Sequence, residues 1–205
     1  MKFLKYHPKF LVTIIFLFLV ILGIVYVNIE HYQDKRNIFD EIYFVEKDIY
    51  PQSNTVLNRI EGISTCSYTD INKQFQGAAE EGYDSTYTPS GYNNVGLSFY
   101  FKNEKFVFSY HKMIDSETKI AIFNKYLVKE KRMIRSLVFI KGGEWIENSK
   151  QIEDLRKQYN ITDQVLEQYN KEILNDFFLR DWCKVYDSKY TPNNWGDVKV
   201  EKGWE

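Results

Sequence analysis

The sequence has 205 residues, of which 27 are basic and 28 acidic, so its formal net charge is −1 at pH 7. Nucleic-acid-binding domains carry a strongly basic surface, and this near-neutral balance argues against that class. The chain contains two cysteines and three histidines, without a CxxC or HExxH pattern. The sequence therefore predicts neither a metal site nor a cofactor.

The first predicted element is an apolar run at residues 10–27, which contains no charged side chain. A helix of this length measures roughly 27 Å at about 1.5 Å per residue, close to the thickness of about 30 Å of a bilayer core. Three lysines precede the run, and the positive-inside rule places residues 1–9 in the cytoplasm. The run ends without the small-residue cleavage site of a secretory signal peptide. The sequence therefore predicts an uncleaved transmembrane anchor, with cleavage as the alternative.

Beyond the anchor, residues 28–37 are polar and are interpreted as a juxtamembrane spacer, and residues 38–205 as one extracytoplasmic domain. Residues 38–45 are rich in apolar side chains, but their periodicity does not discriminate between helix and strand. A capped helix is predicted over residues 53–62. Residues 76–96 are rich in Gly, Tyr, Ser and Asn, and this composition predicts a long loop.

Four consecutive segments rich in aromatic and β-branched residues predict an antiparallel β-meander, because short polar turns separate them. These segments are residues 95–101, 105–114, 119–128 and 132–141. Gly142 and Gly143 are expected to end the sheet. Two helices follow, one capped by Ser149 and one headed by Thr162, and residues 198–200 are predicted to form an edge strand or an exposed end. This order predicts an α+β fold, with an antiparallel β-meander sheet packed by helices and preceded by one N-terminal transmembrane helix.

Groups that could carry out catalysis are few in this sequence. The GxSxG pattern of a nucleophile elbow and the GxxxxGK pattern of a phosphate-binding loop are absent. Of the three histidines, only His111 falls within the predicted sheet. Adjacent carboxylates such as Glu80 and Glu81 are typical of solvated surfaces. The sequence therefore predicts that the protein is not an enzyme.

Tyrosine supplies many of the candidate partner-binding residues, because 16 tyrosines exceed the needs of one small core. Tyrosine together with Ser, Gly and Asn is the composition that binding loops use, and the predicted loop at residues 76–96 has it. Strand periodicity further predicts that polar side chains of the four strands share one face. The candidate partner-binding residues are Tyr83, Tyr87, Tyr92, Tyr100, Ser109, His111, Asn124, Tyr126 and Arg135. The alternative is an ordinary surface loop beside the solvated face of a half-buried sheet.

Cys66 and Cys183 both follow the anchor. In an oxidising compartment they form a candidate disulfide, which would stabilise the fold by about 4–5 kcal/mol in the chain-entropy model. Cysteine is also often a small buried hydrophobe. The sequence therefore leaves a disulfide and two free thiols open.

The sequence resembles the TipC family of immunity proteins, which occur in Gram-positive bacteria such as streptococci. The features that carry the resemblance are the N-terminal anchor, the NIFDEIYF segment at residues 37–44, the four-strand meander and the helical end. The resemblance implies a membrane-anchored protein that neutralises a TelC-type toxin, which a type VII secretion system exports and which attacks lipid II. It also implies that protection comes from binding the toxin, without a reaction by the immunity protein.

Three functions are open on the residues alone. The first is a membrane-anchored immunity protein that binds and neutralises a secreted antibacterial toxin outside the cytoplasm, and this is the function we predict. The second is an extracytoplasmic sensor or accessory domain that binds a small ligand or a cell-wall fragment, for which a deep pocket lined by aromatic residues would be evidence. The third is an envelope enzyme, which would need clustered polar residues with perturbed titration in one cleft. The predicted partners are a protein toxin and the membrane.

Overall fold

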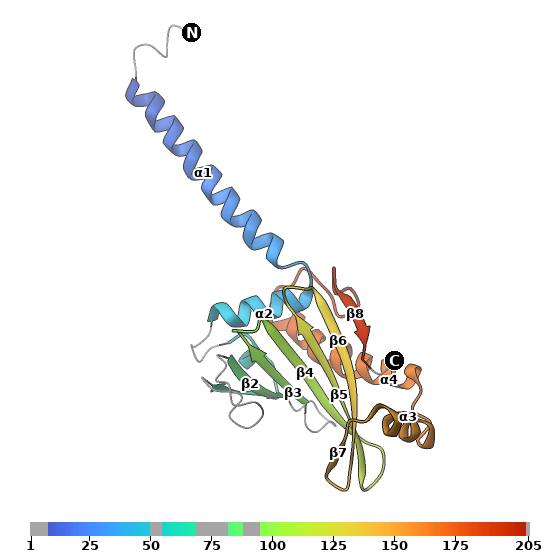
Figure 1. The fold of residues 1–205 in the computed structure, drawn as a ribbon. Coiled ribbons are helices and arrows are strands. Elements are labelled where there is room, and N and C mark those ends of the chain that lie inside the picture. The colour runs from blue at the N-terminus through green and yellow to red at the C-terminus, as the bar shows by residue number, and fades with distance from the viewer. Residues whose placement is uncertain (1–7, 50–54, 69–81, 88–94, 204–205) are drawn as a thin grey trace. The chain divides into compact units, whose positions relative to one another are not determined.

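The chain divides into two compact units in the computed structural model. Residues 1–36 belong to the first unit and residues 37–205 to the second. The residues whose structure is described are 8–49, 55–68, 82–87 and 95–203 (Figure 1).

The described part of the first unit is dominated by one helix, α1, which spans Pro8–Asp34. The side chains of residues 12–25 are all exposed, with Phe16 at 67%. Within the described part of the chain, no helix has both the length and the apolar character needed to cross a membrane.

The second unit is built on one sheet, in which eight strands are described (Figure 1). The strands are β1 (Ile63–Tyr68), β2 (Gly82–Tyr87), β3 (Val95–Tyr100), β4 (Lys105–Met113), β5 (Thr118–Leu127), β6 (Arg132–Lys141), β7 (Glu144–Ile146) and β8 (Lys199–Lys202). Strands β1 to β7 follow one another as antiparallel neighbours, whereas β8 runs parallel to β6. The predicted antiparallel meander is confirmed for β3 to β6.

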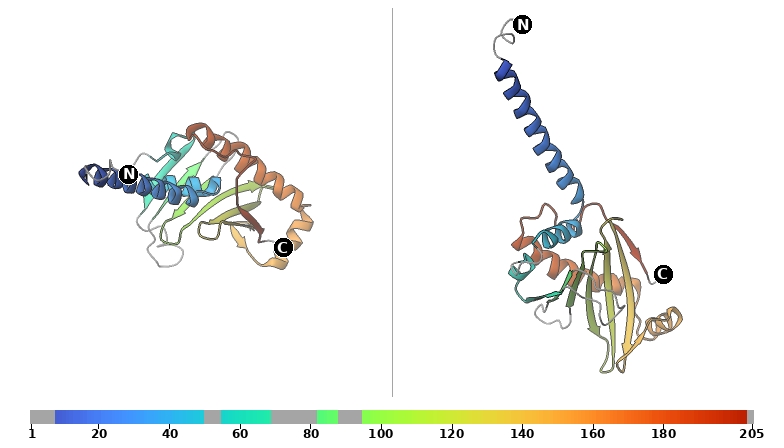
Figure 2. Two further views of the ribbon diagram at one scale, coloured as in Figure 1. Left: turned by 90° about the horizontal axis from the view of Figure 1, so that it is seen from above. Right: turned by 60° about the vertical axis from the view of Figure 1, so that its left-hand side comes forward.

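Helices pack against one face of this sheet (Figure 2). The helical elements of the second unit are α2 (Ile38–Ile49), the 3₁₀ helix η2 (Leu57–Arg59), α3 (Ser149–Gln158), α4 (Asp163–Asn170), the π-helix η3 (Lys171–Leu179) and α5 (Arg180–Val185). Phe39 of α2 lies 6.1 Å from Phe106 and 5.4 Å from Tyr126 between ring centroids. Phe178 of η3 stacks on Phe108 at 5.1 Å. Because all three strand residues are on one face, α2 and η3 bury the same side of the sheet, and the predicted α+β class is confirmed.

Alternation along the strands explains why this face is the core. In β3, Val95, Leu97 and Phe99 are buried, while the intervening residues are only partly buried. In β4, Phe106 and Phe108 are fully buried and pair in register with Phe99 and Leu97. Side chains alternate between the two faces of a strand, so this register collects the apolar residues into one layer.

Three predictions for the second unit need correction. Strand β1 was not predicted, and β2 lies inside the predicted loop, because their sequences lack the apolar alternation that marks a half-buried strand. Gly142 and Gly143 do not end the sheet: their positive φ angles of 56° and 89° make a two-residue hairpin turn into β7. The helix predicted over residues 53–62 is described only as the short η2, whose N-cap Val56 makes no side-chain cap hydrogen bond.

Side-chain caps fix where the helices begin. Asn148, rather than the predicted Ser149, caps α3 by accepting two backbone N–H groups at 3.0 and 3.2 Å. Thr162 caps α4 as predicted. Residues 38–45, which periodicity left ambiguous, lie in α2, where the Asn37 Oδ1 atom accepts two backbone N–H groups at 2.9 Å. Asn37 was assigned to the spacer, but it is fully buried in the second unit.

Candidate partner-binding face

The two faces of the sheet have different surroundings. The covered face carries Phe99, Phe106 and Tyr126 beneath the helices. The open face is formed by the alternate residues of β3 to β6, which pair with one another in register. Its residues are Gly96, Ser98, Tyr100, Lys105, Val107, Ser109, His111, Met113, Lys119, Ala121, Phe123, Lys125, Leu127, Arg132, Ile134, Ser136, Val138 and Ile140.

Of the nine predicted partner-binding residues, three lie on the open face, two lie in β2 and one lies outside the described residues. The open face includes Tyr100, Ser109 and His111, all of which are partly buried. Tyr83 and Tyr87 belong to β2, and their side chains lie outside the described part of the structure. Tyr92 lies outside the described residues altogether.

The remaining three, Asn124, Tyr126 and Arg135, lie on the covered face, so the prediction of one shared face was wrong. Asn124 pairs in register with Phe108 and not with Ser109. Neighbouring residues of a strand point to opposite faces, so a difference of one residue moves a side chain to the other side of the sheet. Asn124 and Tyr126 are fully buried, and Arg135 is 6% exposed.

A buried hydrogen-bond network explains why Tyr126 lies in the core. Its hydroxyl donates to Asp40 Oδ1 at 2.7 Å and accepts from Asn37 Nδ2 at 2.7 Å. Lys131 Nζ lies 2.9 Å from the same carboxylate oxygen, and Asp40 is fully buried. Burial first, and then the Asp40 carboxylate, raise the pKa of Tyr126, so its hydroxyl stays protonated and can donate. This network joins the first turn of α2 to β5.

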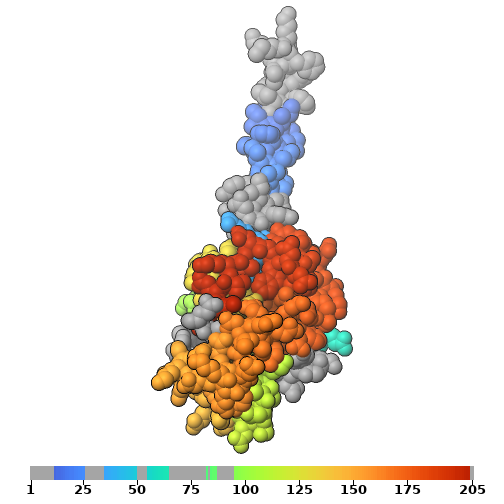
Figure 3. All heavy atoms as spheres, turned by 90° about the vertical axis from the view of Figure 1, so that its right-hand side faces the viewer, coloured from blue at the N-terminus to red at the C-terminus, as the bar shows by residue number. Residues whose placement is uncertain are grey.

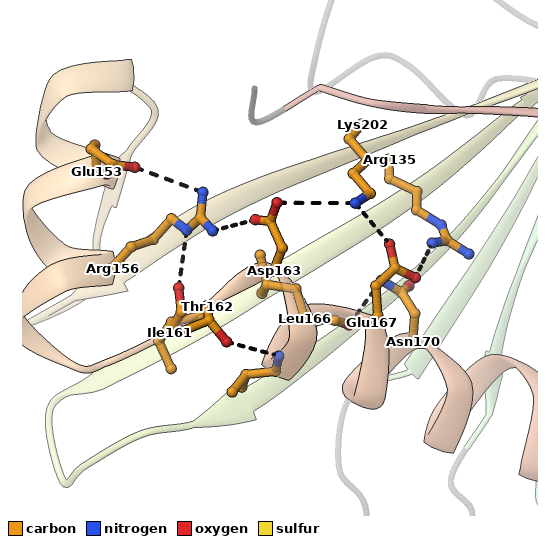
Figure 4. Close-up of polar contacts among 11 residues, drawn as sticks. Arg135, Glu153, Arg156, Ile161, Thr162, Asp163, Leu166, Glu167, Asn170 and Lys202 are labelled. Atoms are coloured by element: carbon orange, nitrogen blue, oxygen red, sulfur yellow. Dashed lines mark hydrogen bonds and ion pairs between the residues drawn. The ribbon is translucent and has the colours of Figure 1, made fainter.

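Arg135 is likewise held within the fold (Figure 4). Its Nη1 atom donates to Glu167 Oε2 at 2.6 Å, and its guanidinium carbon lies 5.7 Å from the centre of the Trp195 ring. Lys202 Nζ lies 3.6 Å from Glu167 and 4.0 Å from Asp163. These ion pairs connect β6 and β8 to α4, so Arg135 braces the sheet against the helical layer.

The open face carries an aromatic cluster formed by His111, which the sequence predicted, and by Phe123 and Trp145, which it did not. The Trp145 ring centroid lies 6.2 Å from that of Phe123 and 6.4 Å from that of His111, edge-on to the imidazole. Trp145 is 53% exposed. Burial, and then the charge of Lys119, lower the pKa of His111 below its ordinary 6.5, so the imidazole is neutral at pH 7. The cluster is therefore an uncharged, partly exposed aromatic surface.

A cavity of about 560 Å³ opens beside this cluster. It is lined by Phe123, Ser136, Leu137, Val138, Trp145, Glu147, Ser149, Ile152, Glu153 and Gly203. Its volume is within the range of about 300–1,000 Å³ that is typical of ligand sites. Its lining combines two aromatic rings with two carboxylates, so it suits a cationic group better than an anionic one.

Phe123 and Trp145 were missed because polar residues were used to identify the face. Phe123 pairs in register with Ser109, so the parity that selected Ser109 also selects this phenylalanine. Trp145 follows the glycine pair that was expected to end the sheet. The sequence contains one indication for Phe123. It is a large aromatic residue next to Ile122, which already points into the core, so Phe123 must lie on the opposite face.

The described cysteine and acid groups do not assemble a reactive site. Cys183 is a free thiol, and its Sγ atom donates to the carbonyl of Tyr190 at 3.7 Å. The candidate disulfide with Cys66, which the sequence left open, is thus not formed; the side chain of Cys66 lies outside the described part. Burial raises the pKa of Cys183, which keeps the thiol protonated. Among the described residues, no group of three or more His, Cys, Asp or Glu could hold a metal ion.

The fold and this face define an α+β domain with a candidate protein-binding surface. A family model described as TipC immunity protein-like matches residues 8–203, and the chain belongs to this family. The solved structure of TipC2 from Streptococcus intermedius B196 is similar, with a TM-score of 0.73 and 28% identity, covering 83% of this chain and 97% of that chain. A search of curated proteins finds no match. The resemblance predicted from the sequence is therefore confirmed.

Proposed function

We propose that this chain is a membrane-anchored immunity protein whose open face binds and neutralises a secreted antibacterial toxin outside the cytoplasm. Membership of the immunity-protein family supports the role. The observation that carries the choice of surface is the aromatic cluster, in which Trp145 is 53% exposed. Exposed aromatic residues on a rigid sheet are the usual anchors of protein interfaces, because they bury a large area when a partner docks.

The charge of the open face indicates the kind of surface it would bind. Across β3 to β6 this face includes Lys105, Lys119, Lys125 and Arg132, and it includes no acidic residue. Arg132 is ion-paired with Glu130 and Glu201, so the three lysines supply the positive charge of this face. We therefore infer that the toxin presents an acidic surface, since complementary charge speeds association and selects the partner.

The exposed apolar side chains of α1 support the proposal of an anchor. Residues 12–25 place Ile, Leu, Phe and Val on every side of the helix, and all are exposed. An exposed apolar surface of this extent is stable only when other apolar groups surround it, and the acyl chains of a lipid bilayer can surround a single helix. The three preceding lysines favour a cytoplasmic N-terminus. Extraction of cell membranes with alkaline carbonate tests this directly, because an anchored chain stays in the membrane pellet.

The position of the buried Asn37 gives the anchor a functional consequence. Only Lys35 and Arg36 separate the end of α1 at Asp34 from Asn37, which hydrogen bonds fix inside the second unit. An anchored α1 would thus keep the binding domain close to the membrane surface. The family resemblance suggests a TelC-type toxin that attacks lipid II, and such a toxin would act at that surface.

The binding proposal is tested by charge reversal on the open face. The double variant Lys119→Glu with Lys125→Glu should weaken toxin binding at least tenfold and should reduce protection of cells that express the full chain. The matched control is Lys150→Glu with Lys171→Glu, which makes the same charge change at exposed positions of the helical layer. Affinity is measured by titrating a purified TelC-type toxin into the full chain in detergent. Equal affinity for both double variants would sink the assignment of the open face.

A small ligand is the second candidate, and the cavity beside Trp145 is the observation that favours it. Its volume of about 560 Å³ would accommodate a cell-wall fragment. A soluble muropeptide that binds the full chain at micromolar concentration, while a toxin of the expected type does not, would decide for a sensor. The basic open face outside the cavity favours the protein partner, because a small ligand would leave most of that face uncovered.

A further inference from the structure

Four polar side chains beneath the helical layer carry buried atoms that have no hydrogen-bond partner within the described part of the chain. These atoms are the hydroxyl oxygen of Tyr110, both amide atoms of Asn124, Nε of Arg135 and Oδ1 of Asn170. Asn124 is fully buried, and the other three residues are at most 6% exposed. The large majority of buried polar atoms in proteins are hydrogen-bonded, so unpaired atoms on neighbouring side chains point to a bound molecule.

The register of the sheet brings three of these side chains together on the covered face. Asn124 of β5 lies directly opposite Arg135 of β6, and the Cβ atoms of such a pair are about 4.5–5.5 Å apart. Tyr110 of β4 lies opposite Ile122, which is two residues before Asn124 and on the same face. This diagonal relation is within reach of an aromatic side chain. The three side chains therefore border one place on the sheet.

The fourth side chain comes from the helical layer. Arg135 Nη1 donates to Glu167 Oε2 at 2.6 Å, and Asn170 is three residues beyond Glu167, so the two share one face of α4. Figure 4 shows Asn170 beside Glu167, on the side of α4 that faces Arg135. Asn170 Nδ2 donates to the carbonyl of Leu166 at 3.2 Å, so Oδ1 is the atom that remains for a partner. On this side of the molecule the helical segment, orange in Figure 3, forms the outer surface.

The charges around these side chains favour an uncharged ligand. The Arg135 guanidinium is compensated by Glu167. Lys202 Nζ lies 3.6 Å from Glu167 and 4.0 Å from Asp163. The two cations thus already face two carboxylates, and neither an anion nor a cation would find an uncompensated charge.

The hydrogen-bonding groups require a ligand that both donates and accepts. Asn124 Nδ2 and Arg135 Nε are donors, whereas Asn124 Oδ1 and Asn170 Oδ1 are acceptors. Burial raises the pKa of Tyr110, and the charge of Arg135 only partly offsets this rise, so the hydroxyl is protonated and can donate. A water molecule donates two hydrogen bonds and accepts two, and it is the smallest neutral molecule that can serve both kinds of atom.

We propose that these four side chains form an internal water site, in which ordered water molecules bridge the sheet to α4. A buried water molecule usually makes about three hydrogen bonds, so about two molecules would satisfy the unpaired atoms. The water would connect β4, β5 and β6 to the helical layer by hydrogen bonds. None of the four side chains except that of Asn170 lies outside the covered face, and none lies on the open face. The inference is therefore independent of the proposed toxin binding.

A crystal structure of the full chain, at a resolution that shows ordered water, is the direct test. Density for water is expected at about 2.7–3.2 Å from Asn124 Nδ2 and from Arg135 Nε. Crystals grown with bromide separate water from a bound anion, because bromide is identified by its anomalous scattering. Bromide at this place, or direct hydrogen bonds among the four side chains with no density between them, would overturn the proposal.

The variant Tyr110→Phe tests the site in solution through the sign of its effect. Loss of a hydroxyl that binds water should lower the urea midpoint, whereas loss of an unpaired buried hydroxyl should raise it. The matched control is Tyr126→Phe on the same face, whose hydroxyl is bonded to Asp40 and Asn37 and whose removal should lower the midpoint. Unfolding of the full chain in detergent is followed by tryptophan fluorescence. A midpoint of Tyr110→Phe that is unchanged or raised would contradict the water site.

The number of internal water molecules provides a third measurement. Magnetic relaxation dispersion of the water oxygen nucleus counts the water molecules that stay inside a protein for long times. Asn124→Leu replaces the amide by an apolar group of similar size and should remove at least one such molecule. The control Asn193→Leu makes the same change at an exposed turn and should leave the number unchanged. Asn170→Leu is the second buried variant and serves if Asn124→Leu does not fold; no loss of water in either folded variant would sink the proposal.

Discussion

On the covered face of the sheet, Tyr126 and Arg135 are paired inside the fold, whereas on the open face aromatic and basic side chains remain accessible. Asp40 and Tyr126 are both fully buried and hydrogen-bonded to each other at 2.7 Å. On the other side, Trp145 is 53% exposed and Lys125 is exposed. The same sheet therefore separates residues that hold the structure from residues that are available to a partner.

This difference changes how the predicted binding residues are interpreted. Buried polar groups stay in a core when each finds a partner, because an unpaired buried group costs about 1–3 kcal/mol. Tyr126 and Arg135 have such partners in Asp40 and Glu167. Their polarity indicates structural pairing, and polarity alone does not identify a binding face. Exposure of large aromatic residues is the better guide here.

The largest expected effect contrasts two phenylalanines of neighbouring strands. Phe106 on the covered face is fully buried and stacks on Phe99 at 5.2 Å, so Phe106→Ala should lower the free energy of unfolding by about 3–5 kcal/mol. Phe123 on the open face is partly buried, so Phe123→Ala should cost only about 1 kcal/mol. Urea unfolding of the full chain in detergent, followed by tryptophan fluorescence, measures both. Equal losses would remove the distinction between the two faces.

The buried carboxylate gives the next largest effect. Asp40→Ala removes the acceptor of Tyr126 and Lys131, and the loss of unfolding free energy should be about 3 kcal/mol, because a buried partner is left unpaired. The side chain of Lys131 is 22% exposed, so it can turn to water and limit the cost. The control Tyr126→Phe removes two hydrogen bonds, with Asp40 and with Asn37, but leaves the carboxylate in place, and it should cost about 2 kcal/mol. If the control were as destabilising as Asp40→Ala, the carboxylate would not be the centre of the network.

The sequence was sufficient to predict the central strands, but it was insufficient to predict which side chains lie on each face of the sheet. The reasons are physical. Segments β3 to β6 have enough apolar and β-branched residues to be recognised one by one. In β5, however, Ile120, Ala121, Ile122 and Phe123 are consecutive, so the alternation that would assign a face is lost. The hydrogen-bond partners of Tyr126 are Asn37 and Asp40, 89 and 86 residues away, and no local pattern indicates contacts of that range. The open face could be recognised only after the register had fixed which side the helices cover.

The smallest expected effect concerns an acid on the same side of the sheet as the open face, in β2. Asp84 pairs in register with Ser98; burial raises the pKa of its carboxyl, and a hydrogen bond from Ser98 partly offsets this rise. A carboxyl whose pKa is raised on folding binds protons more tightly in the folded state, so its ionised form lowers the free energy of unfolding at neutral pH. This penalty disappears as the pH falls through the raised pKa toward 3.8.

Asp84→Asn keeps an acceptor for Ser98 and should raise the free energy of unfolding by about 0.5 kcal/mol at pH 7, a size typical of partly exposed positions. Urea titrations of the two chains at pH 7 and at pH 3.5 check the sign: the gain should be absent at the lower pH. A gain that persists at pH 3.5 would show that packing, and not the charge, limits stability at this position. The contrast between Asp40, a paired acid on the covered side, and Asp84, an unfavourable acid on the open side, would then fail.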